Sequence, residues 1–314
     1  MDIPIARRAL KSGGEKRQTS RKGQNRLTII LFLLPALALF TVFLIYPIVR
    51  SVYFSQFDWN GLGPPVKYVG LENFKRILSD KIFMTAVKNG LLIVVLSLTL
   101  QLPLSLALAI MVGRELPGRV FFRTIFFMPY VLSEVITGII WLGLFNPDPE
   151  RGFINALLVL IGLQPQTFLG NINQALPCIF VVLTWKYFGL HMLLFMAGLQ
   201  NIPKELEEAA RIDGANSWQI IKNVTIPLLS GTIRTSVYLS VVGALTQFNL
   251  VWIMTKGGPV NATEVMATYM YRYGFVRFWL GYGSAVALVM LLICLIFSIV
   301  YLKLVRPPDY LGTY

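Results

Sequence analysis

Few side chains in this 314-residue sequence have a type and a setting suited to chemistry. His191 is the single histidine, and the cysteines, Cys178 and Cys294, both lie in apolar stretches, where a thiol behaves as a small apolar group. The sequence contains no H-E-x-x-H zinc motif, no G-x-S-x-G nucleophile elbow and no G-x-x-x-x-G-K-[ST] phosphate-binding loop. We therefore expect no enzyme active site, no metal and no cofactor. Any energy that the protein uses would come from a gradient or from another polypeptide.

Three ionisable residues, Glu134, Lys186 and Arg234, interrupt long apolar stretches. Charged groups at such positions are costly in a membrane and are candidates for function by default. Arg234 is close enough to the end of its stretch to reach the interface with its long side chain. Glu134 and Lys186 lie deeper, and they either pair with each other or line a polar cavity, which are compatible alternatives. Tyr130 lies one helical turn before Glu134 and shares its face.

The stretches that carry these residues are long enough to cross a membrane. Hydrophobic residues make up 55% of the sequence and charged residues only 14%, whereas a soluble domain has about 25% charged residues. Apolar runs of about 20 residues span the hydrocarbon core as helices. Six such runs occur, at residues 27–49, 86–112, 120–145, 176–199, 226–254 and 281–305. The sequence therefore predicts an all-α membrane protein with six transmembrane helices, while the run at 154–163 is too short to span.

The net charge of +13 has three possible meanings: nucleic-acid binding, contact with anionic lipid, or membrane topology. The segments 1–26, 113–123, 200–223 and 303–314 hold 16 Lys and Arg in 73 residues, against 9 in 93 residues for the alternate connections. The positive-inside rule places the first set, with both termini, in the cytoplasm. The basic tail has no interleaved aromatic residue. We therefore predict a role in orientation and lipid contact, and no nucleic-acid partner.

The connection over residues 200–227 has the sequence pattern of a helix, a turn and a second helix. Pro203 suits a first helical turn, and the acids that follow it favour the positive end of the helix dipole. Gly214 can end this helix in the left-handed conformation, and Asn216 or Ser217 can cap the next one. Two turns of helix are marginal alone. We therefore expect this elbow to pack on another protein from the cytoplasmic side.

The same residues resemble a known motif. Glu208, Ala209, Ala210, Gly214 and Pro227 fall at the spacing of the EAA loop of ABC importer permeases. The segment 224–227, Val-Thr-Ile-Pro, departs conservatively from the I-x-L-P ending of the motif. The extended form, with Asp213, is similar to the carbohydrate-uptake branch. Other matches cover nearly the whole chain after the tail, at 69–74, 128–134, 141, 145–146 and 255–259. The Gly-Gly-Pro element in the last of these resembles the maltose/glycerol-phosphate type of first permease subunit.

The resemblance implies the type I ABC importer permease fold and a set of partners. These are a second, different permease subunit, two ABC ATPase subunits, an extracytoplasmic solute-binding protein and the lipid of the cytoplasmic (inner) membrane of a bacterium or archaeon. It further implies that the elbow is a coupling helix that docks on an ATPase subunit. The coupling residues would be Glu208, Ala209, Ala210, Asp213, Gly214 and Pro227. Three regions follow: a basic tail over 1–26, a six-span domain over 27–305 that includes the 200–227 loop, and a tail over 306–314.

The substrate implied by the resemblance is a mono- or oligosaccharide. Planar hydrogen-bonding groups and aromatic faces suit such a ligand, and Trp185 and Asn249 also offer them. Alignment with the stretches that line the sugar path of maltose-type permeases selects six residues: Tyr130, Glu134, Lys186, Tyr187, Ser240 and Gln247. Each of these could instead be a helix–helix contact. An importer of glycerol phosphate, a polyol or another non-sugar solute, a gradient-driven carrier or channel, and a membrane enzyme remain as alternatives.

Overall fold

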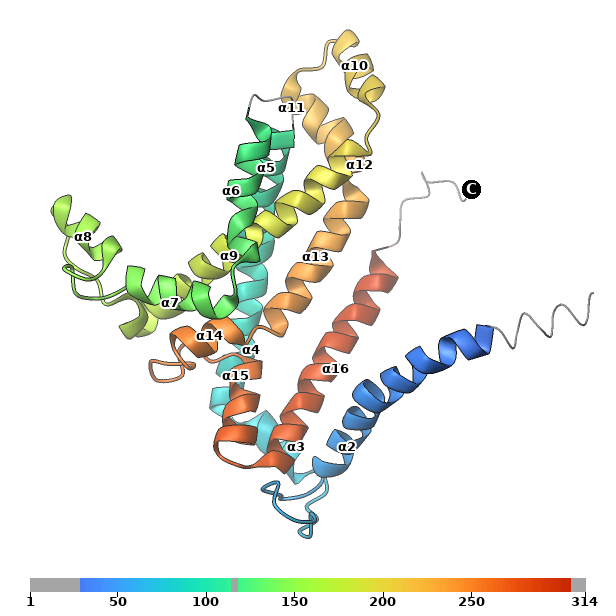
Figure 1. Ribbon diagram of the computed structural model, residues 1–314, viewed down its shortest axis with the longest axis vertical. Coiled ribbons are helices and arrows are strands. Elements are labelled where there is room, and N and C mark those ends of the chain that lie inside the picture. The colour runs from blue at the N-terminus through green and yellow to red at the C-terminus, as the bar shows by residue number, and fades with distance from the viewer. Residues whose placement is uncertain (1–28, 114–117, 306–314) are drawn as a thin grey trace, which may run out of the picture. The chain divides into compact units, whose positions relative to one another are not determined.

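The computed structural model describes residues 29–113 and 118–305, which leaves the predicted tails 1–26 and 306–314 outside the described residues. The regular secondary structure of the described residues is helical, and their one β-type contact is an isolated bridge between Phe57 and Tyr68. They form two compact units that meet between Phe54 and Ser55 (Figure 1). Five helices are long and apolar enough to cross a membrane, and a bent pair makes a sixth. The all-α fold with six predicted spans is thereby confirmed.

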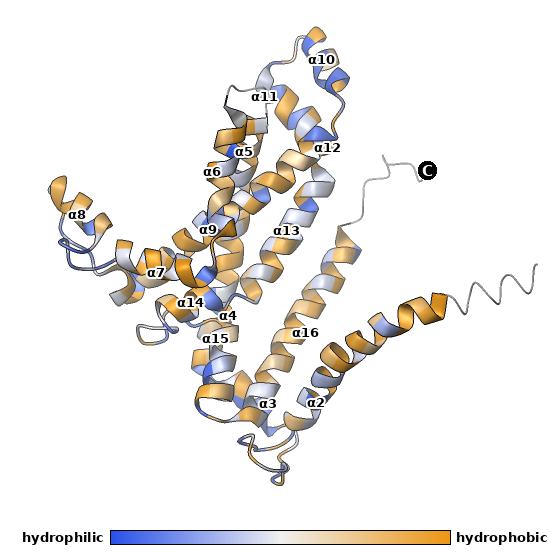
Figure 2. Cartoon of the chain, in the orientation of Figure 1, coloured by the Kyte–Doolittle hydropathy of each residue, from blue (hydrophilic) through white to orange (hydrophobic). Residues whose placement is uncertain are grey.

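The first unit is one long apolar helix, Ile29–Phe54, which includes η1 (Thr41–Ile45) and α2 (Tyr46–Phe54). None of its side chains is buried within the chain. Figure 2 shows it as mostly hydrophobic, with a few polar positions. A surface of this kind is stable in contact with lipid or with another apolar helix, and not in water.

The second unit is built around α9 (Ile172–Gln200), which packs against α5 (Leu102–Gly113) and α6 (Arg119–Val131). More than half of its most apolar window is buried. Gly189 allows the close approach of α6, because any other residue would place a Cβ only 3.0 Å from the Cα of Phe127 and force the helices apart. The central position of α9 explains why it carries polar groups that no lipid-facing helix could hold.

Three further spans belong to this unit, of which the first two pack against α9 and the third packs against the second. The first is continuous from α4 (Lys81–Leu96) through η2 (Ser97–Gln101) into α5, the second contains α13 (Ser230–Leu245) and α14 (Asn249–Met254), and the third is α16 (Leu280–Leu304). Shorter elements complete the unit: α3 (Glu72–Ser79), α8 (Phe153–Leu160), η3 (Phe168–Gly170), α15 (Met266–Tyr271) and η5 (Arg272–Val276). In Figure 1, the elbow helices α10 (Lys204–Ile212) and α11 (Ser217–Ile220) lie at the end of this unit opposite α3.

The third predicted span, 120–145, is not one straight helix. It breaks into α6 and α7 (Glu134–Leu144), which are bent by 98° at residues 132 and 133. Pro129 lacks an amide hydrogen, and both Leu132 and Ser133 adopt extended backbone angles. The hydroxyl of Ser133 then caps α7 by accepting from the amide of Ile136 at 3.4 Å. Hydropathy alone does not detect this break, because both halves are apolar.

The fifth predicted span, 226–254, is also interrupted. After η4 (Ile221–Thr225) and α12 (Ile226–Leu228), α13 runs to Leu245, and α14 begins only at Asn249. The three residues between them, Thr246 to Phe248, are not helical. Irregular backbone at such a depth is tolerated where it is buried in protein or lines a cavity. Both breaks therefore point to the place where a polar solute could bind.

Candidate functional site

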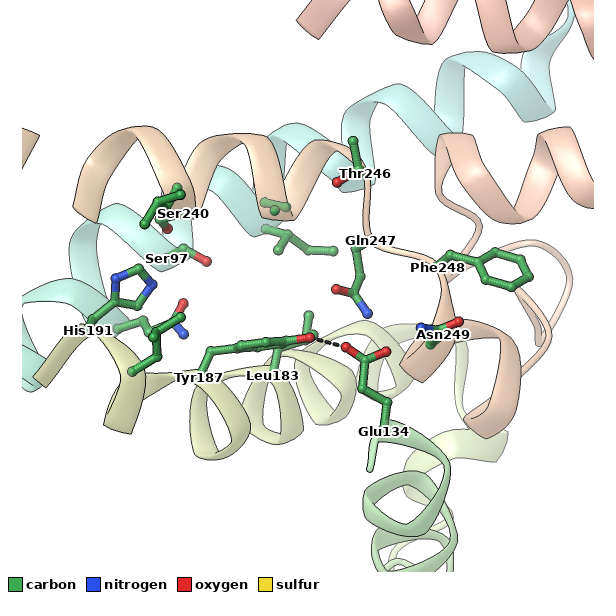
Figure 3. A pocket seen from close by; sticks show the side chains of 16 residues that line it. Ser97, Glu134, Leu183, Tyr187, His191, Ser240, Thr246, Gln247, Phe248 and Asn249 are labelled. Atoms are coloured by element: carbon green, nitrogen blue, oxygen red, sulfur yellow. Dashed lines mark hydrogen bonds between the residues drawn. The ribbon is translucent and has the colours of Figure 1, made fainter. Parts of the chain in front are cut away.

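A cavity of about 350 Å³ lies where the two broken spans meet α9 and the second span. Its lining comes from η2, from the start of α7, from α9, from α13 and from the break between α13 and α14 (Figure 3). Discontinuous helices that bring backbone and polar side chains to the middle of a bundle are the usual setting of transporter binding sites. The polar or ionisable lining residues are Ser97, Gln101, Glu134, Tyr187, His191, Ser240, Thr246, Gln247 and Asn249.

Glu134 is the first residue of α7, so the break in the third span directs its carboxylate into the cavity. The hydroxyl of Tyr187 on α9 donates a hydrogen bond to Oε1 of Glu134 (Figure 3). Glu134 also lies in the first turn of α7, where the helix dipole favours a negative charge. The carboxylate is therefore oriented by two independent features and keeps its second oxygen available.

Lys186 occupies a different place from that expected for a cavity residue. Its ammonium group donates to the backbone carbonyls of Pro129 (3.3 Å), Tyr130 (3.1 Å) and Leu132. These carbonyls end α6 and have no helical partner beyond the break. Lys186 is only 3% exposed and does not line the cavity. It satisfies the break instead of pairing with Glu134.

The six residues predicted to line the substrate path divide into two groups. Glu134, Tyr187, Ser240 and Gln247 line the same cavity. Tyr130 does not line the cavity, and its ring centroid lies 6.2 Å from that of Tyr187. Lys186 does not line the cavity either, because it donates to the carbonyls at the break. Trp185 packs edge-on against Trp141, with ring centroids 5.6 Å apart.

Several cavity residues have buried polar atoms without a hydrogen-bond partner in the described chain. They are Oγ of Ser240, Nε2 of Gln247 and Nδ1 of His191, on side chains 8%, 8% and 4% exposed. Buried polar groups in folded proteins are nearly always satisfied. Unsatisfied donors and acceptors that face one cavity indicate a polar ligand or water as the missing partner.

Two cavity residues were not among the sequence candidates although a signal for them exists. Ser97 and Gln101 are four residues apart in an otherwise apolar run, so they share one face of the second span. Both are 4% exposed. Polar residues at helical spacing within a predicted span would have identified them, whereas the alignment with the sugar path of maltose-type permeases did not select them.

The elbow between α9 and α13 has the predicted local structure. Helix α10 begins directly after Pro203, and Gly214 ends it with a φ of +82°. The amide of Ala215 donates to the carbonyl of Ala210 at 2.9 Å, which is the closing hydrogen bond of a glycine-terminated helix. Asn216 and Gln219 then form a reciprocal capping box at the start of α11. These features confirm the expected helix–turn–helix geometry.

The elbow exposes both charged and apolar side chains. Glu208, Ala209 and Asp213 are exposed, as is Pro227, and Ala210 is half-buried. Leu206, Ile212 and Trp218 are 44%, 86% and 69% exposed. A groove of about 370 Å³ runs beside Leu206 and Pro227. An element this short with so much uncovered apolar surface requires a partner to bury it.

The loop that carries the Gly-Gly-Pro sequence connects α14 to α15 and is held in place by three side chains. Asn89 donates to the carbonyls of Ala262 (2.9 Å) and Glu264 (2.8 Å). Arg272 donates to Oδ1 of Asn261 (2.9 Å) and to the carbonyl of Lys256, and its guanidinium lies 2.7 Å from the carboxylate of Glu264. Because Glu264 is completely buried, this loop is a fixed part of the fold.

The arrangement of broken spans, a polar central cavity and an exposed elbow defines a membrane transport component, and comparison with known sequences agrees. The sequence profile described as binding-protein-dependent transport system inner membrane component matches residues 101–307. The chain belongs to this family of ABC transporter permeases, which are membrane transport components and not enzymes.

Relatives in bacteria and archaea are similar over almost their whole length. A probable ABC transporter permease of Pyrococcus horikoshii is 36% identical, with 87% of this chain and 94% of the relative aligned. A probable ABC transporter permease of Bacillus subtilis is 36% identical over 89% of this chain and 96% of the relative. The diacetylchitobiose uptake system permease of Streptomyces coelicolor is 32% identical over 87% of this chain and 81% of the relative.

Solved structures share the fold. A chain of the bacterial alginate ABC transporter, crystallised with its periplasmic protein carrying an alginate pentasaccharide, superposes with a TM-score of 0.81. It is 24% identical, and the match covers 91% of this chain and 96% of that chain.

Proposed function

We propose that the protein is one of two different permease subunits of an ATP-driven importer that takes up a mono- or oligosaccharide. An extracytoplasmic solute-binding protein would deliver the sugar, and two ABC ATPase subunits would supply the energy. The observation that best supports ATP-driven import is the exposed elbow, because a gradient-driven carrier or a channel has no use for a docking element of this kind. Relatives with assigned cargo include permeases for diacetylchitobiose and arabinooligosaccharides, and the sugar assignment rests on them.

In this proposal the elbow faces the cytoplasm, as do both termini. The excess of Lys and Arg in the segments on the elbow side supports this orientation. Glu208 serves as an exposed polar anchor for the ATPase subunit, and Ala209 and Ala210 permit its close approach. Asp213, Gly214 and Pro227 set the turn and the return of the chain into the membrane. ATP-driven closure of the ATPase pair would move the elbow and open the cavity outward.

The cavity is the proposed path of the sugar. Its free hydroxyl, amide and imidazole groups match the alternating donors and acceptors of a polyhydroxylated ligand. Glu134, Tyr187, Ser240 and Gln247 would contact the sugar directly. Tyr130 and Lys186 would shape the path from behind by holding the break between α6 and α7. A glycerol phosphate permease is also among the relatives, so import of a non-sugar solute is the alternative to import of a sugar.

The test is uptake by the complete transporter in proteoliposomes, with ATP present or absent. We expect uptake only with ATP, and we expect Glu208→Ala to reduce sugar-stimulated ATP hydrolysis about tenfold and to weaken co-purification of the ATPase subunits. Glu205→Ala removes an equally exposed acid from the same helix and serves as the matched control. Uptake that continues without ATP, or Glu208→Ala behaving as Glu205→Ala does, would contradict the proposal.

A further inference from the structure

The charge of the cavity restricts what can pass through it. Among the residues that line it, Glu134 is the one carboxylate, and no lysine or arginine lines it within the described chain. The remaining lining side chains are neutral polar groups, aliphatic groups and the rings of Tyr187, His191 and Phe248. A solute in the cavity therefore meets a negative group directly and no permanent positive group.

The nearest cation, Lys186, acts on Glu134 through space but makes no direct ion pair with it. Lys186 is buried, and its ammonium donates to three backbone carbonyls on the far side of the break. Its three N–H donors are therefore used at the carbonyl end of α6, where the helix dipole favours a positive charge, and none is left for a solute in the cavity. Glu134, in contrast, receives only the neutral hydroxyl of Tyr187.

The unsatisfied groups of the cavity suit hydroxyl groups. Nε2 of Gln247 offers a hydrogen, while Oγ of Ser240 can donate or accept. A hydroxyl also donates well to a carboxylate such as that of Glu134, whereas a fully ionised carboxylate, sulfonate or phosphate has no hydrogen to donate and is repelled by it. Figure 3 shows Gln247 and Glu134 directed toward the same part of the cavity.

From these observations we infer that the transported solute carries no negative charge, and that Glu134 is the residue that selects against anions. This inference rests on the proposed import function and deepens it, because the relatives include permeases named for neutral sugars and for the anionic solutes glycerol 3-phosphate and sulfoquinovosyl glycerol. The inference therefore separates this chain from the permeases named for anionic solutes. Tyr187, which also lines the cavity, orients the carboxylate of Glu134 through its hydrogen bond.

The first experiment measures the charge of the cavity without requiring transport. In the complete transporter, Cys178 and Cys294 are replaced by alanine and Asn249→Cys is introduced as a reporter, because Asn249 is exposed and lines the cavity. Cationic trimethylammonium-ethyl and anionic sulfonatoethyl methanethiosulfonates are then compared for their reaction rates. We expect the cationic reagent to be favoured about tenfold over the ratio found for a free thiol.

Glu134→Gln keeps the shape of the side chain and removes its charge, so it should return the rate ratio close to that of a free thiol. Glu150→Gln is the matched control, since it removes an exposed acid outside the cavity, and it should leave the ratio unchanged. Tyr187→Phe should lower the ratio only in part, and Glu134→Asp should retain most of it. A ratio that is the same with and without the Glu134 charge overturns the inference. Because the partner subunits are present, any charge that they contribute is included.

The second experiment identifies the cargo itself. The cognate solute-binding protein is purified with its natural ligand, and the released ligand is analysed by mass spectrometry. A neutral or amino sugar supports the inference, and a uronic acid, sulfonate or phosphate overturns it. If the rate ratio is as expected but no ATP-dependent uptake is found, the import function fails while the electrostatic property of the cavity stands.

Discussion

Two buried or half-buried glutamates in this protein illustrate opposite uses of the same side chain. Glu264 is completely buried in the loop after α14, and its carboxylate lies 2.7 Å from the guanidinium of Arg272. Glu134 is half-buried at the break of the third span, receives one neutral hydroxyl and faces a cavity. An acid that has a cation and no access to a ligand stabilises the fold. An acid that has access to a ligand and no direct ion pair is available for function.

The largest expected effect comes from removing the cation of the first site. Arg272→Ala leaves Glu264 as an uncompensated buried acid and removes two further hydrogen bonds that hold the loop. We expect the free energy of unfolding to fall by about 3 kcal/mol. The measurement is thermal or denaturant unfolding of the purified transporter in lipid nanodiscs. Arg151→Ala is the control, because its 3.6 Å pair with Asp148 is exposed and should cost less than about 0.5 kcal/mol.

A smaller loss of stability is expected at Lys186, the cation that lies near Glu134 without forming an ion pair with it. Lys186→Met fills a similar volume but leaves the carbonyls at the end of α6 without a donor. Unsatisfied buried acceptors cost about 1–3 kcal/mol, and we expect a loss of stability in this range. The exposed Lys88 on α4 provides the control variant Lys88→Met. Equal stability of the two variants would show that the ammonium of Lys186 is not required at the break.

The third effect is a pH dependence of the free energy of unfolding that comes from Glu264. Burial raises the pKa of Glu264 above its ordinary value, and the nearby Arg272 opposes that rise in pKa without cancelling it. Between the ordinary and the raised pKa, the folded protein binds more protons than the unfolded chain, so stability decreases as the pH increases through this window. The slope contributed by one such group is at most about 1.4 kcal/mol per pH unit.

Glu264→Gln should abolish this part of the pH dependence, and the difference between the unfolding curves of the two proteins isolates it from all other groups. A Glu264→Gln protein with an unchanged slope above pH 4.5, the ordinary pKa of the acid, would show that Glu264 is ionised in the fold throughout. In that case the ion pair with Arg272 outweighs the burial.

The sequence predicts the spans and the elbow because both depend on local patterns. Apolar runs define helices such as α16, and Pro203, Gly214 and Asn216 mark the boundaries of the elbow helices by their own backbone preferences. The composition of the cavity is partly predictable as well. Four of the six proposed lining residues do face it.

The remaining features depend on contacts between distant segments. The break between α6 and α7 requires that Lys186, more than 50 residues later, donate to the freed carbonyls. The sequence shows a deep lysine and a deep glutamate and leaves pairing and cavity lining open as alternatives for them. The carbonyls at the end of α6 are a closer partner for Lys186 that hydropathy does not reveal. For the same reason, the cavity at the break between α13 and α14 follows only from the folded chain.

The smallest effect on stability is expected at the second glutamate, and it is the sharpest test of the comparison. Glu134→Gln removes a charge that makes no ion pair and keeps an acceptor for the hydroxyl of Tyr187, so the free energy of unfolding should change by less than about 0.5 kcal/mol. The same substitution should relax the charge preference of the cavity about tenfold. A residue that stabilised the fold as Glu264 does would show the reverse pattern. Unfolding and reagent rates measured on the same nanodisc preparation decide which pattern Glu134 follows, because a structural acid cannot leave stability intact while it changes the local potential.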